Sequence, residues 1–124
     1  MATLMRDAVV ERFASAREQL APFEIWEVPY NDEATIKFFK PLVLVPTWMP
    51  DDPDEPSENE YLQIIRPDIN VDVWAETRDE LLEVVLSEIC FVWEHIVLRE
   101  DGELDAESKR IKKEHLTIAE LVDG

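Results

Sequence analysis

The order of apolar and polar residues divides the first third of the chain into a helix and two strands. Residues 3–20 carry apolar side chains at helical spacing, and Ala21-Pro22 ends this segment because proline disfavours a helical residue before it. This amphipathic helix either packs on the domain or serves as a docking or dimerisation helix. Residues 23–30 alternate instead, which predicts a strand with one face toward solvent. The residues expected on its buried side are Phe23, Ile25 and Val28.

A polar turn and a second extended segment follow. Asn31-Asp32-Glu33 is typical of a hairpin turn, and residues 35–40 predict the next strand, which continues through residues 42–45. Prolines cannot donate to a central ladder, so we expect these strands to be bulged or to lie at an edge. The prolines concerned are at positions 29, 41, 46 and 50.

An acidic segment separates the two halves of the chain. Residues 50–60 hold six acids, three prolines and no apolar or basic residue. Such a segment cannot bury enough surface to offset its ordering entropy. We therefore predict a mobile acidic loop over about residues 49–60, which connects elements of one domain.

The second half begins with two short strands and a capped helix. Residues 61–65 and 71–75 predict strands, and the second alternates apolar residues with Asp72 and Trp74. Thr77-Arg78-Asp79-Glu80 is a capping box, which predicts a helix over about residues 78–98. Its apolar face is broad, as in a central helix on a sheet. The stripe is Leu81, Val85, Ile89, Val92 and Ile96, widened by Leu82, Leu86 and Trp93.

These elements predict a single α+β domain over residues 1–124. A three- or four-stranded, mainly antiparallel sheet is covered on one face by the helix at 78–98. The N-terminal helix packs at its margin, as does a short C-terminal helix that Asp105 caps and that reaches about Leu116.

Composition narrows the class of protein. The 124 residues include 29 acids and 12 bases, a net charge of −17, and 46% are hydrophobic. This indicates a folded domain and argues against direct nucleic-acid binding. The lone Cys90 excludes a disulfide framework, and we expect neither a membrane span nor a signal segment. The expected location is the reducing cytoplasm.

The sequence predicts no catalytic, cofactor-binding or metal-binding residue. His95 and His115 lie on separate predicted helices without a second histidine one turn away. Cys90 sits among apolar residues and is expected to behave as a small hydrophobe. With only Gly102 and Gly124, the chain has no glycine-rich phosphate loop. Carboxylates are abundant, but no spacing selects a pair for acid–base work.

Residues 60–97 resemble the HicB-type antitoxin fold. The resemblance is carried by a strand at 61–65, a turn at 66–68, a strand at 71–75 and the capped helix that begins at Thr77. It implies a partial ribonuclease-H-like α+β fold without the catalytic acids of that enzyme. It also implies a protein that binds and masks a small basic ribonuclease.

The resulting prediction of function is a non-enzymatic acidic protein that binds a basic protein partner. Its rim acids would raise the association rate, while apolar anchors would set the lifetime of the complex. Three alternatives stay open: simple solubility through charge, a homo-oligomeric structural protein, and a small acid-dependent hydrolase. Nucleic-acid mimicry is a further variant of the binding hypothesis.

Trp48 either anchors the partner or covers one end of the sheet. The predicted partner-binding residues are Trp48, Met49, Asp51, Asp52, Asp54 and Glu55.

Overall fold

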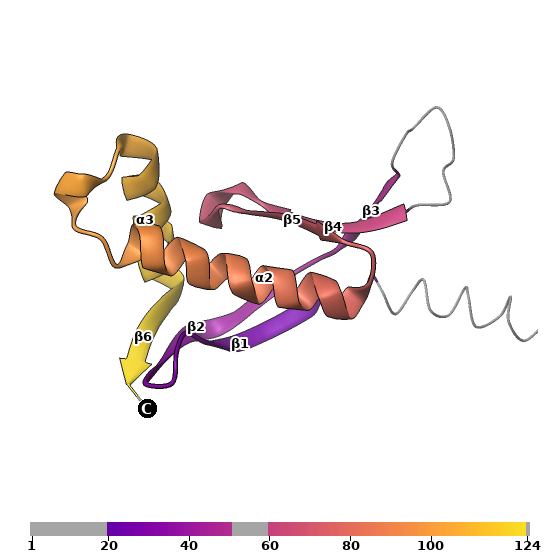
Figure 1. Ribbon diagram of the computed structural model, residues 1–124, viewed down its shortest axis with the longest axis horizontal. Coiled ribbons are helices and arrows are strands. Elements are labelled where there is room, and N and C mark those ends of the chain that lie inside the picture. The colour runs from indigo at the N-terminus through magenta and orange to yellow at the C-terminus, as the bar shows by residue number, and fades with distance from the viewer. Residues whose placement is uncertain (1–19, 51–59, 124) are drawn as a thin grey trace, which may run out of the picture.

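The described part of the chain combines two small antiparallel sheets with two α-helices (Figure 1). The computed structural model describes residues 20–50 and 60–123. The first sheet has the order β1-β2-β6 and the second the order β3-β4-β5. The strands are β1 (Phe23–Pro29), β2 (Ala34–Leu44), β3 (Thr47–Pro50), β4 (Glu60–Arg66), β5 (Val71–Ala75) and β6 (Ala119–Asp123).

The α+β class is confirmed, but the prediction of one sheet of three or four strands is wrong. The chain passes from β2 into β3 through Val45 and Pro46 and so changes sheet. Pro46 has no N–H to donate, which interrupts the ladder at this point. The strand β6 is absent from the predicted elements and completes the first sheet.

The predicted bulge lies in the ladder between β1 and β2, where β2 holds the extra residues. The pairing between β1 and β2 shifts between Ile25 and Glu27, so Trp26 alone faces the β2 stretch from 38 to 41. Pro41 falls in this stretch. Because Pro41 has no regular partner in β1, its missing N–H does not disturb the regular part of the ladder. The bulge also explains why the buried residues of β1 are Phe23, Ile25 and then Val28.

The helix α2 (Arg78–Val92) begins at the predicted cap. The Thr77 hydroxyl accepts a hydrogen bond of 3.2 Å from the backbone N–H of Glu80. A π-helical turn, η2 (Trp93–Val97), continues the helix. The π turn holds one more residue per turn than an α-helix, which rotates the later side chains around the axis. Val97 is therefore buried where the predicted stripe had Ile96, which is only partly buried.

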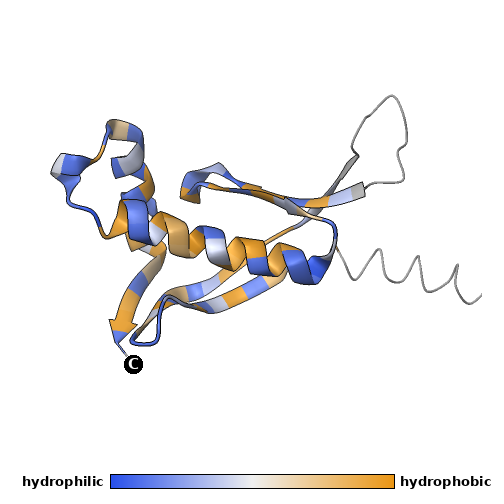
Figure 2. Ribbon diagram, viewed as in Figure 1, coloured by the Kyte–Doolittle hydropathy of each residue, from blue (hydrophilic) through white to orange (hydrophobic). Residues whose placement is uncertain are grey.

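One apolar core joins α2 to both sheets. The helix contacts β4 and β5 of the second sheet and β1 of the first, so it lies against strands on two sides (Figure 1). Hydrophobic residues follow its length in Figure 2. The fully buried side chains include Leu81, Val85 and Ile89 on α2, Ile36 on β2 and Ile64 on β4.

The C-terminal helix, α3 (Ala106–Ile118), is slightly longer than predicted. Its cap is confirmed, because the Asp105 carboxylate accepts a hydrogen bond of 2.7 Å from the N–H of Ser108. The chain then continues as β6, along which Ala119 is buried and Glu120 is exposed.

Two predicted segments fall wholly or largely outside the described residues. The helix predicted over residues 3–20 lies there except for Leu20, which is in a turn. The predicted loop at 49–60 is shorter than expected, since Met49 and Pro50 belong to β3 and Glu60 to β4. Residues 51–59, and with them its predicted mobility, lie outside the described part.

Candidate functional site

The outward side of the second sheet carries large apolar side chains. Strand alternation directs Leu62 and Ile64 of β4 to the core, and the residues between them to the other side. We call that other side the outer face. On it, Trp74 of β5 is 58% exposed and Ile65 of β4 is 54% exposed. The outer face of β4 and β5 consists of Tyr61, Gln63, Ile65, Asp72 and Trp74.

The register of β4 and β5 brings these side chains together. Trp74 stands opposite Gln63, and Asp72 stands opposite Ile65. Trp74 and Ile65 are therefore diagonal neighbours, a separation that an aromatic ring can span. The result is an indole beside an aliphatic side chain, with a carboxylate adjacent on the same strand.

The chain around Val43 extends this apolar area. The Arg66 guanidinium, at the end of β4, donates a hydrogen bond of 3.1 Å to the carbonyl of Val43. This bond holds the end of β2 beside the end of β4. Val43 and Val45 are 46% and 58% exposed. Single exposed hydrophobic residues are ordinary, but several in neighbouring positions are typical of an interaction surface.

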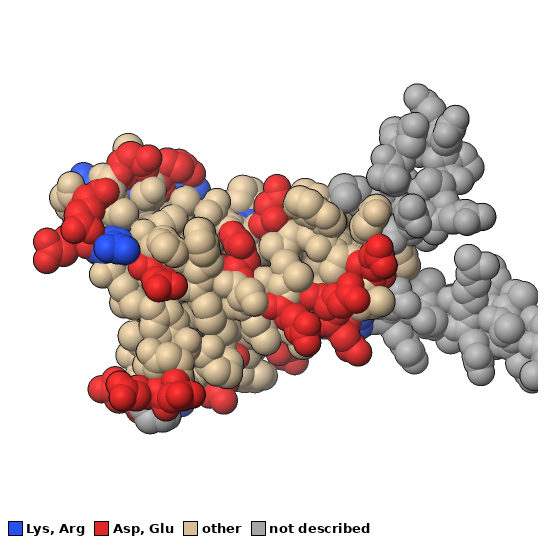
Figure 3. All heavy atoms as spheres, in the orientation of Figure 1, with Lys and Arg blue, Asp and Glu red and all other residues tan. Residues whose placement is uncertain are grey.

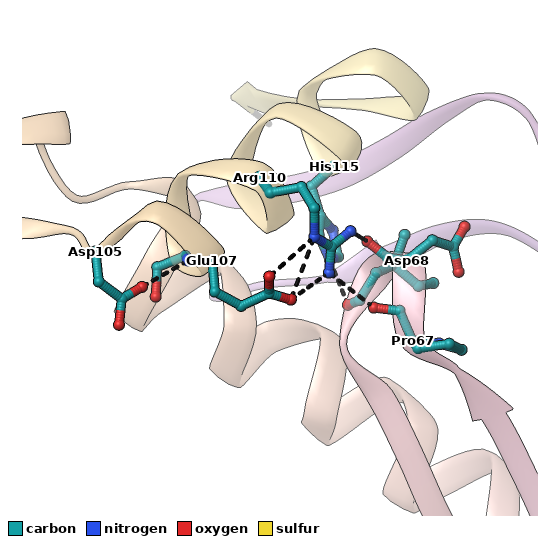
Figure 4. A network of polar contacts seen from close by, with 8 residues as sticks. Pro67, Asp68, Asp105, Glu107, Arg110 and His115 are labelled. Atoms are coloured by element: carbon teal, nitrogen blue, oxygen red, sulfur yellow. Dashed lines mark hydrogen bonds and ion pairs between the residues drawn. The ribbon is translucent and has the colours of Figure 1, made fainter.

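The turn between β4 and β5 is held from one side by α3. This turn contains the 3₁₀ segment η1 (Pro67–Ile69). Arg110 donates to the carbonyls of Pro67 and Asp68 at 3.2 and 3.3 Å, and it is also paired with Glu107 at 2.6 Å (Figure 4). The pair with Arg110 lowers the pKa of Glu107 below its ordinary value.

His115 of α3 holds the next carbonyl of the same turn. Its Nε2 lies 2.8 Å from the oxygen of Ile69, and the side chain is completely buried. Three successive carbonyls, from Pro67 to Ile69, are thus bound to α3. On β4, Arg66 forms two hydrogen bonds to Asp68 at 3.0 Å, which lower the pKa of that carboxyl. These contacts fix the position of the hairpin that carries the outer face.

Charge is unevenly distributed over the described surface. Between described residues, the ion pairs that bring a Lys or Arg to a carboxylate all involve η1, α3 or the segment before α3. At the start of α2, the exposed acids Glu76, Asp79, Glu80 and Glu83 form no such pair with another described residue. Figure 3 shows acidic side chains gathered near that end of α2 and the clearest basic patch near α3. The surface around the connection from β5 to α2 and the first turns of α2 is therefore negative.

The predicted binding residues are divided by the structure. Trp48 is only partly exposed and packs on the core, opposite the fully buried Leu62. Trp48 therefore lies on the core side of the second sheet and not on the outer face. Met49 lies in β3 opposite Tyr61. The predicted acids Asp51, Asp52, Asp54 and Glu55 lie outside the described residues, in the connection between β3 and β4.

Two of the four tryptophans are exposed, and each lies on the solvent side of a strand. Trp26 on β1 is 59% exposed and Trp74 on β5 is 58% exposed. The sequence pattern did indicate that Trp74 faces away from the core, because this residue alternates with the apolar residues of its strand. Alternation alone could not tell whether another element covered that face.

The described surface has a hollow beside α2 that is lined by one thiol and one carboxylate. The hollow, of about 680 Å³, lies between α2 and the β1–β2 turn, and Glu94 is the one acid among its lining residues, which also include Cys90 and Phe91. Burial raises the pKa of the Cys90 thiol, so it is not an activated nucleophile. Within the described ranges, no group of three or more His, Cys, Asp or Glu residues could hold a metal ion.

Comparisons with known proteins add no relative. No family model, no curated protein and no solved structure matches this chain. Among the described helices, none is both long enough and apolar enough to cross a membrane.

Proposed function

We propose that this protein is a non-enzymatic binding domain that docks a basic protein partner on the outer face of β4 and β5. The observation that carries the proposal is the half-exposed indole of Trp74 beside Ile65, with Asp72 on the same strand. Tryptophan is enriched among the residues that dominate binding energy, and it needs an apolar neighbourhood to exclude water.

The net charge of −17 favours a partner of opposite sign. Carboxylates around an apolar centre steer a basic protein toward it and raise the association rate. In this proposal Trp74 and Ile65 determine how long the complex lasts, and the surrounding acids determine how fast it forms.

An antitoxin-like role is the concrete version of this proposal. The resemblance of residues 60–97 to HicB-type antitoxins supports it, because those proteins mask a small basic ribonuclease. The segment that carries the resemblance also contains the outer face of β4 and β5. In this version the domain inhibits its partner by covering the partner's functional surface.

The test compares two equally exposed tryptophans. The full chain, its Trp74→Ala variant and its Trp26→Ala variant are used to capture partners from the cells in which the protein occurs, at low salt. We expect the parent chain and Trp26→Ala to retain a basic protein. Trp74→Ala should weaken that complex by about 2 kcal/mol or more.

Two further measurements separate the alternatives. The association rate with the captured protein should fall steeply as salt is added, because screening shortens the range of the charge attraction. Equal capture by all three chains would remove Trp74 as the anchor and the proposal with it. A homo-oligomer predicts a solution mass well above 14.5 kDa without any partner.

A further inference from the structure

Among the described residues, the strand β5 has an open main-chain edge. In the sheet order β3-β4-β5, its described strand partner is β4 alone. A strand at the edge of a sheet leaves alternate N–H and C=O groups without a strand partner, and these can pair with another chain. The five residues Val71–Ala75 are all in regular register with β4, so the ladder is not interrupted.

The other described edges are less suited to accept a strand. The ladder that pairs the edge strand β1 with β2 is interrupted next to Ile25, and β1 ends at Pro29. The edge strand β3 has four residues and ends at Pro50. The edge strand β6 is regular, but it carries no aromatic side chain. Among these edges, β5 alone joins an uninterrupted ladder to an exposed tryptophan.

The edge of β5 is also held in place before any partner arrives. Its inward side chains Val71 and Val73 are buried under α2, and the preceding turn is bound to α3 through Arg110 and His115. A preorganised edge loses little conformational entropy when another strand adds to it.

We propose that an extended segment of a basic protein partner adds to β5 as the fourth strand of this sheet. The proposal rests on the proposed function and specifies how the partner binds. The segment alternates basic and apolar residues, since successive side chains of a strand point to opposite faces. On the outer face, one basic side chain pairs with Asp72 and the next lies over the Trp74 ring, as a cation over an aromatic face.

Charge selects this occupant over a second copy of the chain. A second β5 would bring its own Asp72 to the edge and a further 17 negative charges to the complex. The chain already shows the favoured contact elsewhere, because the Arg78 guanidinium lies 3.9 Å from the centre of the Phe23 ring. An arginine-containing strand meets both Asp72 and Trp74 with attractive contacts.

The probe is a capped peptide of alternating arginine and valine, titrated into the full chain at low salt. One matched peptide carries N-methyl groups on three successive central residues, which block both main-chain edges without changing charge. A second has glutamate in place of arginine. We expect the first peptide to bind and both others to bind about tenfold or more weakly. Amide hydrogen exchange should slow in Val71–Ala75 when the first peptide is bound.

Three results would overturn strand addition: no binding of the arginine–valine peptide, unchanged exchange in β5, or equal binding of the N-methylated peptide. Failure of the proposed function has a different signature. In that case Trp74→Ala would hold the cellular partner as well as the parent chain does. If β5 exchange is unchanged while Trp74→Ala still loses that partner, docking on the outer face stands and strand addition falls.

Discussion

The indole Nε1 of Trp93 donates a hydrogen bond of 3.1 Å to Nδ1 of His115, and the two rings meet edge to face. Since Nδ1 accepts this bond, His115 is the neutral tautomer that carries its proton on Nε2, from which it donates to Ile69. The pair joins the π turn after α2 to α3 and to the turn before β5. Both ring nitrogens of a completely buried histidine are thereby used.

Stability should fall when the pH drops from about 7 to 5. Burial lowers the pKa of His115 below 6.5, although Asp68 and Glu114 oppose this shift. Below the pKa that His115 has in the unfolded chain, the unfolded chain binds the proton more readily than the folded chain does. Folding therefore becomes less favourable as the pH falls, by at most about 1.4 kcal/mol per pH unit. Above that pKa the effect vanishes. Urea unfolding at several pH values measures it.

The matched control for this pH dependence is His95, which is exposed in the π turn η2 that continues α2. The His95→Asn variant should keep the slope between pH 6.5 and 5. If the parent chain shows no loss of stability in that range, the neutral form of His115 assigned above is wrong.

Trp93→Phe should destabilise the protein by about 1–3 kcal/mol beyond any packing loss. The change removes the donor and leaves the buried Nδ1 of His115 without a partner. Trp26→Phe makes the same chemical change at an exposed position and should stay within about 0.5 kcal/mol of the parent. Denaturant midpoints compare the two variants. Equal midpoints would show that the Trp93–His115 bond contributes nothing.

Thr77→Ala should cost about 1 kcal/mol, because the N–H of Glu80 loses its acceptor at the start of α2. Thr77→Ser keeps a hydroxyl at the same place and should be close to neutral. The free energy of unfolding from urea titration tests both. A cost for serine as large as that for alanine would assign the effect to the lost methyl group.

Asn70 should tolerate glycine but not valine. It follows η1 with φ 58° and ψ 43°, a left-handed conformation, and its N–H bonds to the Pro67 carbonyl. Valine in this conformation is expected to cost about 1–2 kcal/mol, since its Cβ crowds the backbone. The thermal midpoint of the two variants provides the measurement. A stable Asn70→Val chain with an unchanged β4–β5 turn would contradict the strain argument.

Local structure was predictable wherever neighbouring residues determine it. The alternation of Val71, Asp72, Val73 and Trp74 predicted a strand with the observed inward side, and the hydroxyl of Thr77 predicted the start of α2. The candidate site was predicted less well. The alternation places Trp74 on the same strand face as Asp72. Its exposure, however, depends on whether another element covers that face of the sheet.

The spacing of apolar residues and helix capping act over a few residues. The sequence by itself therefore determined the α+β class, most of the strands and both described helices, and its composition determined the negative charge. Only the tertiary structure decided how the strands divide into two sheets, because pairing partners lie far apart in the chain. Contacts across the core likewise decided the strand β6, the burial of Val97 in place of Ile96, and the inward position of Trp48. The bond between Trp93 and His115 spans 22 residues and depends on the packing of α3 against the end of α2, which no local pattern records.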